Sequence, residues 1–237
     1  MSAIYAMRKA IAQKILVENR ASYDQMAGEF SASRARFWDE LAELATYANE
    51  GDTVLDIGCG NGRFFPLIQT RGATYVGMDN SQGLLKEAER QYPDATFVEG
   101  DGTLLPFPDA SFDVAYSFAV IHHVPSKELR AQFVREAARI LKPKGTLVIT
   151  TWEIWQAKYF WKLVQTALRS ILGLSPLDIG DVMLTFGNKK HARYVHAFTT
   201  KEFANILETN GFIVNELTVI KRKSGAANIV AVATKKD

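Results

Sequence analysis

From residue 53 onward, short hydrophobic stretches alternate with longer amphipathic stretches. β-branched and aromatic residues dominate the short stretches, which we expect to be strands. These strands cover residues 53–57, 74–79, 95–101, 112–118 and 145–152. Between them we expect helices over residues 61–72, 81–92 and 125–145. This alternation predicts an α/β fold with a mostly parallel sheet covered by helices on both faces.

The flanking regions have different patterns. Residues 4–50 are typical of helices, with breaks expected near 19–22 and 31–33, and form an expected N-terminal helical cap. An aromatic-rich helix followed by glycines predicts an insertion over the carboxyl edge of the sheet. Near the carboxyl terminus we expect a helix over 199–211 and an antiparallel hairpin of strands 212–220 and 227–236. We therefore expect a single domain, 1–237, divided into a cap (1–50), a core (51–152), an insertion or lid (153–190) and a C-terminal helix with strands (191–237).

Composition excludes several classes of protein. With 47% hydrophobic and 23% charged residues, the chain is typical of a globular protein and not of a disordered one. Its longest apolar stretch, residues 114–124, is too short to span a bilayer, and residues 1–15 predict an uncleaved amphipathic helix. The single cysteine, Cys59, excludes an intrachain disulfide and a multi-thiolate zinc site, so we expect a cytoplasmic protein without a metal centre.

The most specific motif is a glycine-rich turn after the first expected strand. Residues 54–63 read VLDIGCGNGR, which gives GxGxG with Asp56 two residues before the first glycine. A dinucleotide-binding loop would need glycine where Arg63 stands. Glycines at these positions let the backbone approach a ligand, although they would also suit a tight strand-to-helix turn. Cys59 is better explained as a small buried residue than as a nucleophile.

Two further acids end the next two expected strands. Asp79 ends residues 74–79, and Asp101 ends residues 95–101. Asp79 could also cap the helix that begins near Ser81. However, the carboxyl ends of successive parallel strands are where open α/β sheets bind ligands, so three such features together indicate a binding site.

These motifs resemble those of the class I S-adenosylmethionine-dependent methyltransferases. The resemblance implies a Rossmann-like fold with a seven-stranded, mostly parallel sheet. It also implies that the glycine turn holds the amino acid part of S-adenosylmethionine, that Asp79 binds the ribose hydroxyls and that Asp101 recognises the adenine. The implied product of the cofactor is S-adenosylhomocysteine.

Four segments resemble a narrower group, the eukaryotic tRNA wobble-uridine carboxymethyl methyltransferases. They are residues 19–34 with Trp38, residues 56–63, residues 105–113 with 119–123, and residues 193–198. Two departures are Val195, where the family has a tyrosine, and residues 151–153, which match a tryptophan motif only in part. The implied reaction is O-methylation of the carboxylate of 5-carboxymethyluridine in tRNA.

The resemblance also implies which residues form the site. As catalytic residues that hold the acceptor carboxylate it suggests His123, Arg193 and His196, although any lone histidine could equally be a core residue. His122 and His123 should point to opposite faces of an extended segment, so only one should enter the site. The expected cofactor-binding residues are Tyr23, Arg34, Asp56, Gly58, Gly60, Asn61, Gly62, Asp79, Asn80, Asp101, Gly102 and Ala119.

The expected partner is the anticodon loop of tRNA, and no membrane contact is expected. Basic runs at 189–193, 221–223 and 235–236 could bind its phosphates or could only keep the surface solvated. The resemblance also implies a small zinc-binding activator subunit that covers the edge strand near residues 95–98. Two alternatives remain: methyl transfer to a small molecule, and a cofactor-binding or RNA-binding adaptor without catalysis. A nicotinamide oxidoreductase is disfavoured by Arg63.

Overall fold

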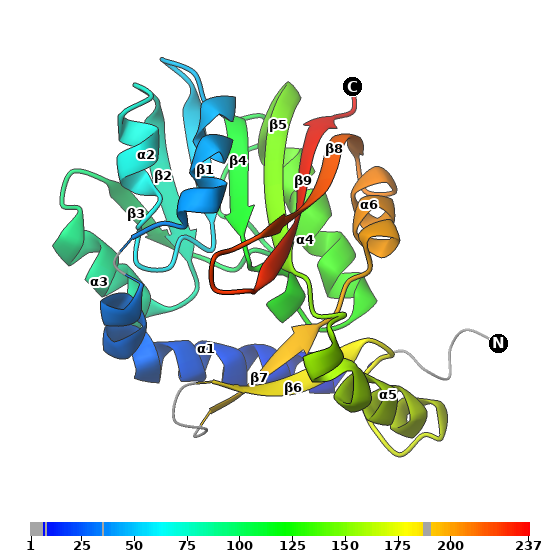
Figure 1. Cartoon of the computed structure of the whole chain (residues 1–237). Helices are drawn as coiled ribbons and strands as arrows, with labels where there is room; N and C mark the ends of the chain where they lie inside the picture. The colour runs from blue at the N-terminus through cyan, green and yellow to red at the C-terminus, as the bar shows by residue number, and fades with distance from the viewer. Residues whose placement is uncertain (1–6, 8, 35, 187–190) are drawn as a thin grey trace.

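A seven-stranded mixed sheet forms the centre of the molecule (Figure 1), in a computed structural model that describes residues 7, 9–34, 36–186 and 191–237. The strand order is β3-β2-β1-β4-β5-β9-β8. The first five strands are mutually parallel, whereas β9 pairs antiparallel with both β5 and β8. The strands are β1 Thr53–Ile57, β2 Thr74–Asp79, β3 Thr96–Glu99, β4 Phe112–Phe118, β5 Leu141–Trp152, β8 Phe212–Lys221 and β9 Ala227–Lys235. The expected fold class and the C-terminal hairpin are confirmed.

The helices differ from expectation in two places. The first, α1, runs without a break from Lys9 to Ser33, so the break expected near 19–22 is wrong. Helix α4 ends at Ile140 instead of near 145, because Leu141 already pairs with Phe112 in the sheet. The remaining helices are η1 Asp39–Tyr47, α2 Phe65–Gln69, α3 Gln82–Gln91, η2 Ile121–His123, α5 Ala157–Ile171 and α6 Thr200–Glu208, where η marks a 3-10 helix.

A second, two-stranded sheet lies beside α1, below the main sheet in Figure 1. It consists of β6 Asp181–Phe186 and β7 His191–His196, paired antiparallel. Sequence analysis missed both strands, because the surrounding glycines resemble an irregular insertion. The backbone amide of Tyr194 donates to Asn19 Oδ1 at 3.2 Å and so attaches β7 to α1.

Two hydrophobic clusters bury the faces of the main sheet. Phe133 of α4 and Phe203 of α6 belong to the cluster on one face. Leu41 of η1 and Phe64, just before α2, belong to the cluster on the other face. Within the ranges described, no helix combines the length and apolar character needed to cross a bilayer.

The glycine turn after β1 is fixed to the end of β2 by backbone hydrogen bonds. The amides of Gly58 and Cys59 both donate to the carbonyl of Met78, at 2.7 and 3.0 Å. Gly58 has a φ of 77°, and a Cβ atom placed there would overlap Cγ2 of Val120. This position therefore requires glycine for its backbone angle and for space.

Replacing Gly58 with alanine should destabilise the protein more than the same change at a glycine in open space. Gly173 has a similar φ of 68°, and an added Cβ there meets nothing within 4 Å. We expect Gly173→Ala to cost about 1–2 kcal/mol from the backbone angle alone, and Gly58→Ala a further 1–3 kcal/mol, roughly, from overpacking. Urea unfolding measures both free energies, and equal losses would show that the Val120 contact is unimportant.

Candidate functional site

A cavity lies at the carboxyl ends of the parallel strands, between the sheet, α1 and β7. Most of the residues expected from the sequence line it, namely Tyr23, Arg34, Gly58, Gly60, Asn61, Asp79, Asn80, Asp101, Gly102, Ala119, His123 and Arg193. Three expected residues, Asp56, Gly62 and His196, are not part of this lining. Residues that are far apart in the sequence, such as Tyr23 and Arg193, thus line one cavity.

Asp79 connects the glycine turn to the start of α3. Its Oδ2 accepts from the amide of Gly60 and its Oδ1 from the amide of Ser81, each at 2.9 Å. Ser81 itself caps α3, because its Oγ accepts from the amide of Leu84. Burial raises the pKa of Asp79, while these amide donors oppose the rise. Asp79 is therefore an oriented acceptor at the cavity wall and not the cap of the helix.

Asp56 and Asp101 have different surroundings. Asp56 is buried behind the turn, where its Oδ2 accepts from the hydroxyl of Tyr75 at 2.9 Å. Burial raises the pKa of Asp56 to about 7, against the effect of the Tyr75 hydrogen bond. Asp101 lines the cavity, and its Oδ1 accepts from the amide and hydroxyl of Thr103. Asp56 thus joins β1 to β2 away from the cavity lining, whereas Asp101 is accessible to a ligand.

Asn61, which lines the same cavity, has a buried side-chain oxygen. Its Nδ2 donates to the carbonyl of Arg34 at 3.2 Å. Its Oδ1 is buried without a hydrogen-bond partner among the described residues. A buried acceptor without a donor is costly, so a ligand that donates a hydrogen bond here would be stabilised.

Tyr23, His123 and Arg193 form a hydrogen-bonded group on the opposite side of the cavity. The Nδ1 atom of His123 lies 2.9 Å from the carbonyl of Tyr194, so this nitrogen carries the proton. The Tyr23 hydroxyl then donates to His123 Nε2 at 3.0 Å and accepts from Arg193 at 2.8 Å. Burial, with the nearby Arg193 charge, lowers the pKa of His123 to about 3. His123 is therefore a neutral residue that orients Tyr23.

His122 points away from this group. It is fully buried, and its Nδ1 lies 3.2 Å from the Thr151 hydroxyl. The two histidines stand on the 3-10 turn η2, not on the extended segment that we expected, and their rings lie 4.3 Å apart. Burial lowers the pKa of His122 well below its usual value. Only His123 of the pair lines the cavity.

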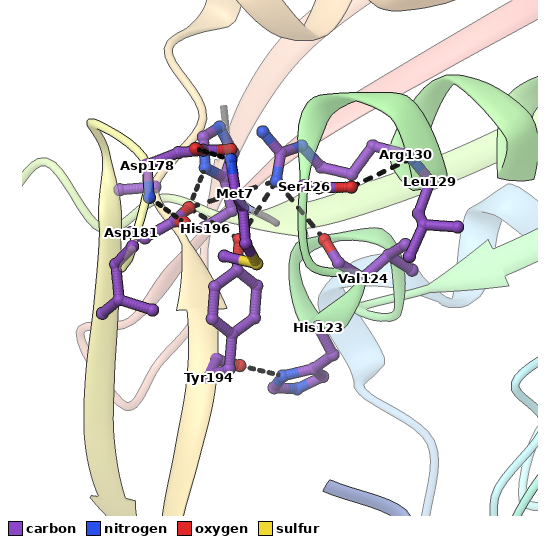
Figure 2. Close-up of polar contacts among 12 residues, drawn as sticks. Met7, His123, Val124, Ser126, Leu129, Arg130, Asp178, Asp181, Tyr194 and His196 are labelled. Carbon is purple, nitrogen blue, oxygen red and sulfur yellow. Dashed lines mark hydrogen bonds and ion pairs between the residues drawn. The ribbon is translucent and has the colours of Figure 1, made fainter. Parts of the chain in front are cut away.

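His196 belongs to a buried polar network behind the cavity (Figure 2). Its Nδ1 lies 2.7 Å from Asp181 and its Nε2 lies 2.9 Å from Glu202. Asp181 also accepts from the Tyr194 hydroxyl, to which Arg130 donates. Since both ring nitrogens already face carboxylates, His196 is not placed to hold an acceptor carboxylate. We correct its expected role to that of anchoring β7, which carries Arg193.

Other cavity residues were not assigned to the site from the sequence. They include Asn19, Arg63, Trp152 and Arg222. Asn19 belongs to a segment with a family resemblance, yet only the fold shows that its amide joins the His123 carbonyl to the Tyr194 amide. Arg222 stands in one of the basic runs, but the sequence gives no sign that its turn reaches the cavity. Among the residues that the structure describes, no cluster of histidine, cysteine and carboxylate groups is arranged to hold a metal ion.

The two buried histidines predict that the protein loses stability in mild acid. Both are neutral when folded but take up a proton near pH 6.5 when unfolded, so the unfolded state binds more protons as the pH falls. The free energy of unfolding should then fall by up to about 1.4 kcal/mol per pH unit per histidine below pH 6.5. Urea unfolding from pH 7 to 4 should give a shallower slope for His123→Gln than for the unchanged chain. Parallel curves would show that His123 is not held neutral.

Similarity to known proteins covers the central part of the chain. Residues 55–149 match the family model described as "Methyltransferase domain". A candidate methyltransferase of Encephalitozoon cuniculi is 40% identical over 131 residues, covering 55% of this chain and 60% of that protein. A tRNA (carboxymethyluridine(34)-5-O)-methyltransferase of Macaca fascicularis is 36% identical over 135 residues, covering 56% of this chain and 20% of that protein. The chain thus spans less than two thirds of the length of these relatives.

Solved structures share the fold across most of the chain. An S-adenosylmethionine-dependent methyltransferase of Methanosarcina mazei has a TM-score of 0.72 at 23% identity, covering 85% of this chain and 99% of that one. A chain from the complex of the Haloferax volcanii Trm112 methyltransferase activator with a candidate methyltransferase has a TM-score of 0.67 at 21% identity, covering 92% and 98%. A Burkholderia thailandensis 1,6-didemethyltoxoflavin-N1-methyltransferase, solved with that compound and S-adenosylhomocysteine, has a TM-score of 0.61 at 20% identity, covering 96% and 88%. Residues 55–149 thus form a methyltransferase domain, and the strand order with its strand-end cavity is that of the class I S-adenosylmethionine-dependent methyltransferase fold.

Proposed function

We propose that this protein methylates the carboxylate of 5-carboxymethyluridine at the wobble position of tRNA. The observation that carries the proposal is the position of Arg193, which faces the cavity beside Tyr23 and across from the strand ends. A cation there is suited to an anionic acceptor. The relatives that bear this activity in their names, such as the Macaca fascicularis protein, support the same acceptor.

The residues at the strand ends fit S-adenosylmethionine. Asp79 and Asp101 offer carboxylate oxygens for hydroxyl and amino donors, and the Asn61 Oδ1 atom offers a buried acceptor for an ammonium group. The glycine turn leaves the backbone open to a ligand, since a Cβ at Gly60 would meet only Phe30, at 3.8 Å. When bound, the cofactor supplies an electrophilic methyl group on a sulfonium centre.

The acceptor needs orientation more than activation. A carboxylate with a pKa near ~4 is already ionised at neutral pH, so no general base is required. This agrees with His123, whose two nitrogens are both engaged in hydrogen bonds. In the proposed reaction, Arg193 holds the carboxylate, the Tyr23 hydroxyl that accepts from Arg193 keeps it in position, and the surrounding side chains exclude water. Positioning by these residues then supplies much of the rate enhancement.

A small-molecule acceptor is the second candidate. The Burkholderia thailandensis relative in fold holds a small heterocyclic acceptor. The aromatic side chains of Tyr23, Phe30 and Trp152 in this cavity could pack against such a compound as well as against a uracil ring. Identification of the methylated product therefore distinguishes a small-molecule acceptor from a uridine of tRNA.

An activator subunit is a further proposed partner. Strand β3 forms one edge of the main sheet, and its Phe97 and Val98 side chains are only half-buried. A partner that adds to this edge would cover them and would pair the exposed backbone groups of β3. The Haloferax volcanii complex with an activator supports such an arrangement through a neighbour of the same fold.

Asp79→Ala should weaken cofactor binding. Losing hydrogen bonds between a buried carboxylate and a ligand costs about 1.5–3 kcal/mol each, so we expect S-adenosylhomocysteine to bind at least tenfold more weakly by calorimetry. Asp109→Ala removes an exposed carboxylate outside the cavity and should leave the affinity unchanged. Because Asp79 also supports the glycine turn, the melting temperature of each variant is measured in parallel. Unchanged affinity in Asp79→Ala would contradict its ribose-binding role.

The proposed reaction predicts a base-labile methyl ester on the wobble uridine. Purified protein is incubated with methyl-tritiated S-adenosylmethionine and tRNA that carries 5-carboxymethyluridine, alone and with an activator subunit. The labelled nucleoside is then identified by mass. Arg193→Lys keeps the charge but not the planar fork of donors, so we expect at least tenfold slower transfer with unchanged S-adenosylhomocysteine affinity. Arg169→Lys on α5 is the matched control outside the cavity.

Label on a small acceptor, with none in RNA under either condition, would replace the proposed acceptor with the second candidate. Equal losses of transfer and of cofactor affinity in Arg193→Lys would place Arg193 in the scaffold or the cofactor site.

A further inference from the structure

A second hollow lies next to the cavity, at the turn between β8 and β9. This hollow is lined by Ser33, Arg34, Trp38, Glu40, Arg222 and Ser224. Arg34, Trp38 and Arg222 also line the main cavity, so the two spaces adjoin. The second hollow, which we call the turn cleft, has no role in the reaction described above.

Guanidinium groups are concentrated along the turn cleft. The guanidinium carbons of Arg63 and Arg222 lie 4.0 and 4.9 Å from the centre of the Trp38 ring. The guanidinium carbon of Arg34 lies 4.4 Å from the centre of the Phe30 ring. Aromatic stacking of this kind fixes the planes of the guanidinium groups and leaves their edges for hydrogen bonds.

The charges of these arginines influence one another. Burial lowers the pKa of Arg34, and the charges of Arg193 and Arg222 lower it further. Burial also lowers the pKa of Arg222, which Glu40 partly offsets. Arg222 has in addition a buried Nε atom without a hydrogen-bond partner in the described part of the chain. A row of cations thus runs from the acceptor side of the cavity, at Arg193, to the turn at Arg222.

The cofactor accounts for only part of such a row, because its single carboxylate can engage one guanidinium group while its sulfonium is repelled by positive charge. Phosphate, in contrast, matches the charge and the forked geometry of guanidinium groups. Ser224, which lines the same hollow, adds a hydroxyl group, whereas the Ser33 hydroxyl donates to the Phe30 carbonyl and accepts from Arg34. The other basic runs do not share this position. Lys235 and Lys236 donate to the carbonyls of Leu141 and Glu208, and Lys189 and Lys190 lie outside the described residues.

We propose that the turn cleft binds a phosphate group of the methyl acceptor, with Arg222 and Arg34 as its main ligands. The inference rests on the proposed function, because it assumes that the acceptor occupies the adjoining cavity. It makes the acceptor a phosphorylated nucleoside, either a free nucleotide or a residue of an RNA chain. The tip of the β8–β9 hairpin becomes a determinant of specificity that distinguishes such an acceptor from an uncharged metabolite.

The phosphate site is tested with an RNA that has no carboxymethyl group, because its binding cannot depend on contacts to the acceptor carboxylate. The probe is a fluorescent anticodon stem-loop with an unmodified wobble uridine, titrated in the presence of S-adenosylhomocysteine. We expect Arg222→Ala to weaken binding about tenfold or more and to reduce the slope of log affinity against log salt by about one. Lys236→Ala removes the same charge at the other end of the hairpin and should change the affinity less than twofold. Arg222→Lys should have an intermediate effect.

Competition identifies the source of the phosphate. Displacement of the RNA by uridine 5′-monophosphate but not by uridine supports a free nucleotide as ligand, whereas displacement only by RNA supports a phosphodiester. Equal competition by uridine and its monophosphate, or equal effects of Arg222→Ala and Lys236→Ala, would overturn the proposal.

The experiments distinguish failure of the phosphate site from failure of the proposed acceptor. Binding that depends on Arg222, without any methyl ester on carboxymethyluridine, would keep the phosphate site and refute the proposed acceptor. Methyl ester formation together with RNA binding that is unchanged in Arg222→Ala would keep the proposed acceptor and refute the phosphate site.

Discussion

The attachment of the glycine turn to the end of β2 is the constraint on which the site depends. The amides of Gly58 and Cys59 share the Met78 carbonyl, and the amide of Gly60 donates to the Asp79 carboxylate. These bonds hold the turn against the neighbouring strand, which is possible only because β1 and β2 are parallel and end at the same edge. Asp79 is thereby oriented by the same contacts that shape the turn. The location of such a site follows from the strand order and does not depend on which acceptor is methylated.

The acceptor side depends on a different set of contacts, made by elements outside the main sheet. Arg193 is carried by β7, which is fixed to α1 through Asn19 and to α6 through the contact of His196 with Glu202. Arg130 of α4 reaches the same network through the Tyr194 hydroxyl. Figure 2 shows that this network also includes His123, through the Tyr194 carbonyl. The hairpin shares a small hydrophobic cluster with Leu163 of α5 through Val182 and Val195. The buried polar bonds add directional contacts that define the position of Arg193.

Most of the residues expected to bind the cofactor line the cavity, because their positions follow from local signals. A strand, a glycine turn and an acid at the end of each of the next two strands are readable in order along the chain. Helix α1 was harder to predict, since Ser22 resembles a break. In the structure its hydroxyl donates to the Glu18 carbonyl one turn earlier, which lets the helix continue.

The acceptor side could not be predicted in the same way, because it depends on tertiary contacts. Adjacent side chains of a strand point to opposite faces, and the same rule separates Arg193 from His196 within β7. For Arg193 and His196, this alternation would have shown that only one of the two can face the cavity. For His122 and His123 the rule did not apply, because the chain forms the turn η2 there and not a strand. The contribution of Arg222 depends on where the tip of a distant hairpin lies, which no local pattern records.

The resulting cleft is divided by charge, and this division has a chemical consequence. The acids Asp79 and Asp101 lie at the strand ends. The arginines come from other elements: Arg34 follows α1, Arg193 is in β7 and Arg222 is in the β8–β9 turn. A cation bound beside the acids and an anion bound beside the arginines would meet between the two sides. Methyl transfer from a sulfonium to a carboxylate cancels both charges, so tight binding of the separated ions would favour the ground state and slow the reaction. In the proposed arrangement, Arg222 and Arg34 bind a phosphate that does not react and only Arg193 binds the reacting carboxylate, which would avoid this conflict. The affinity for the acceptor would then come from a part of the molecule whose charge is unchanged in the transition state.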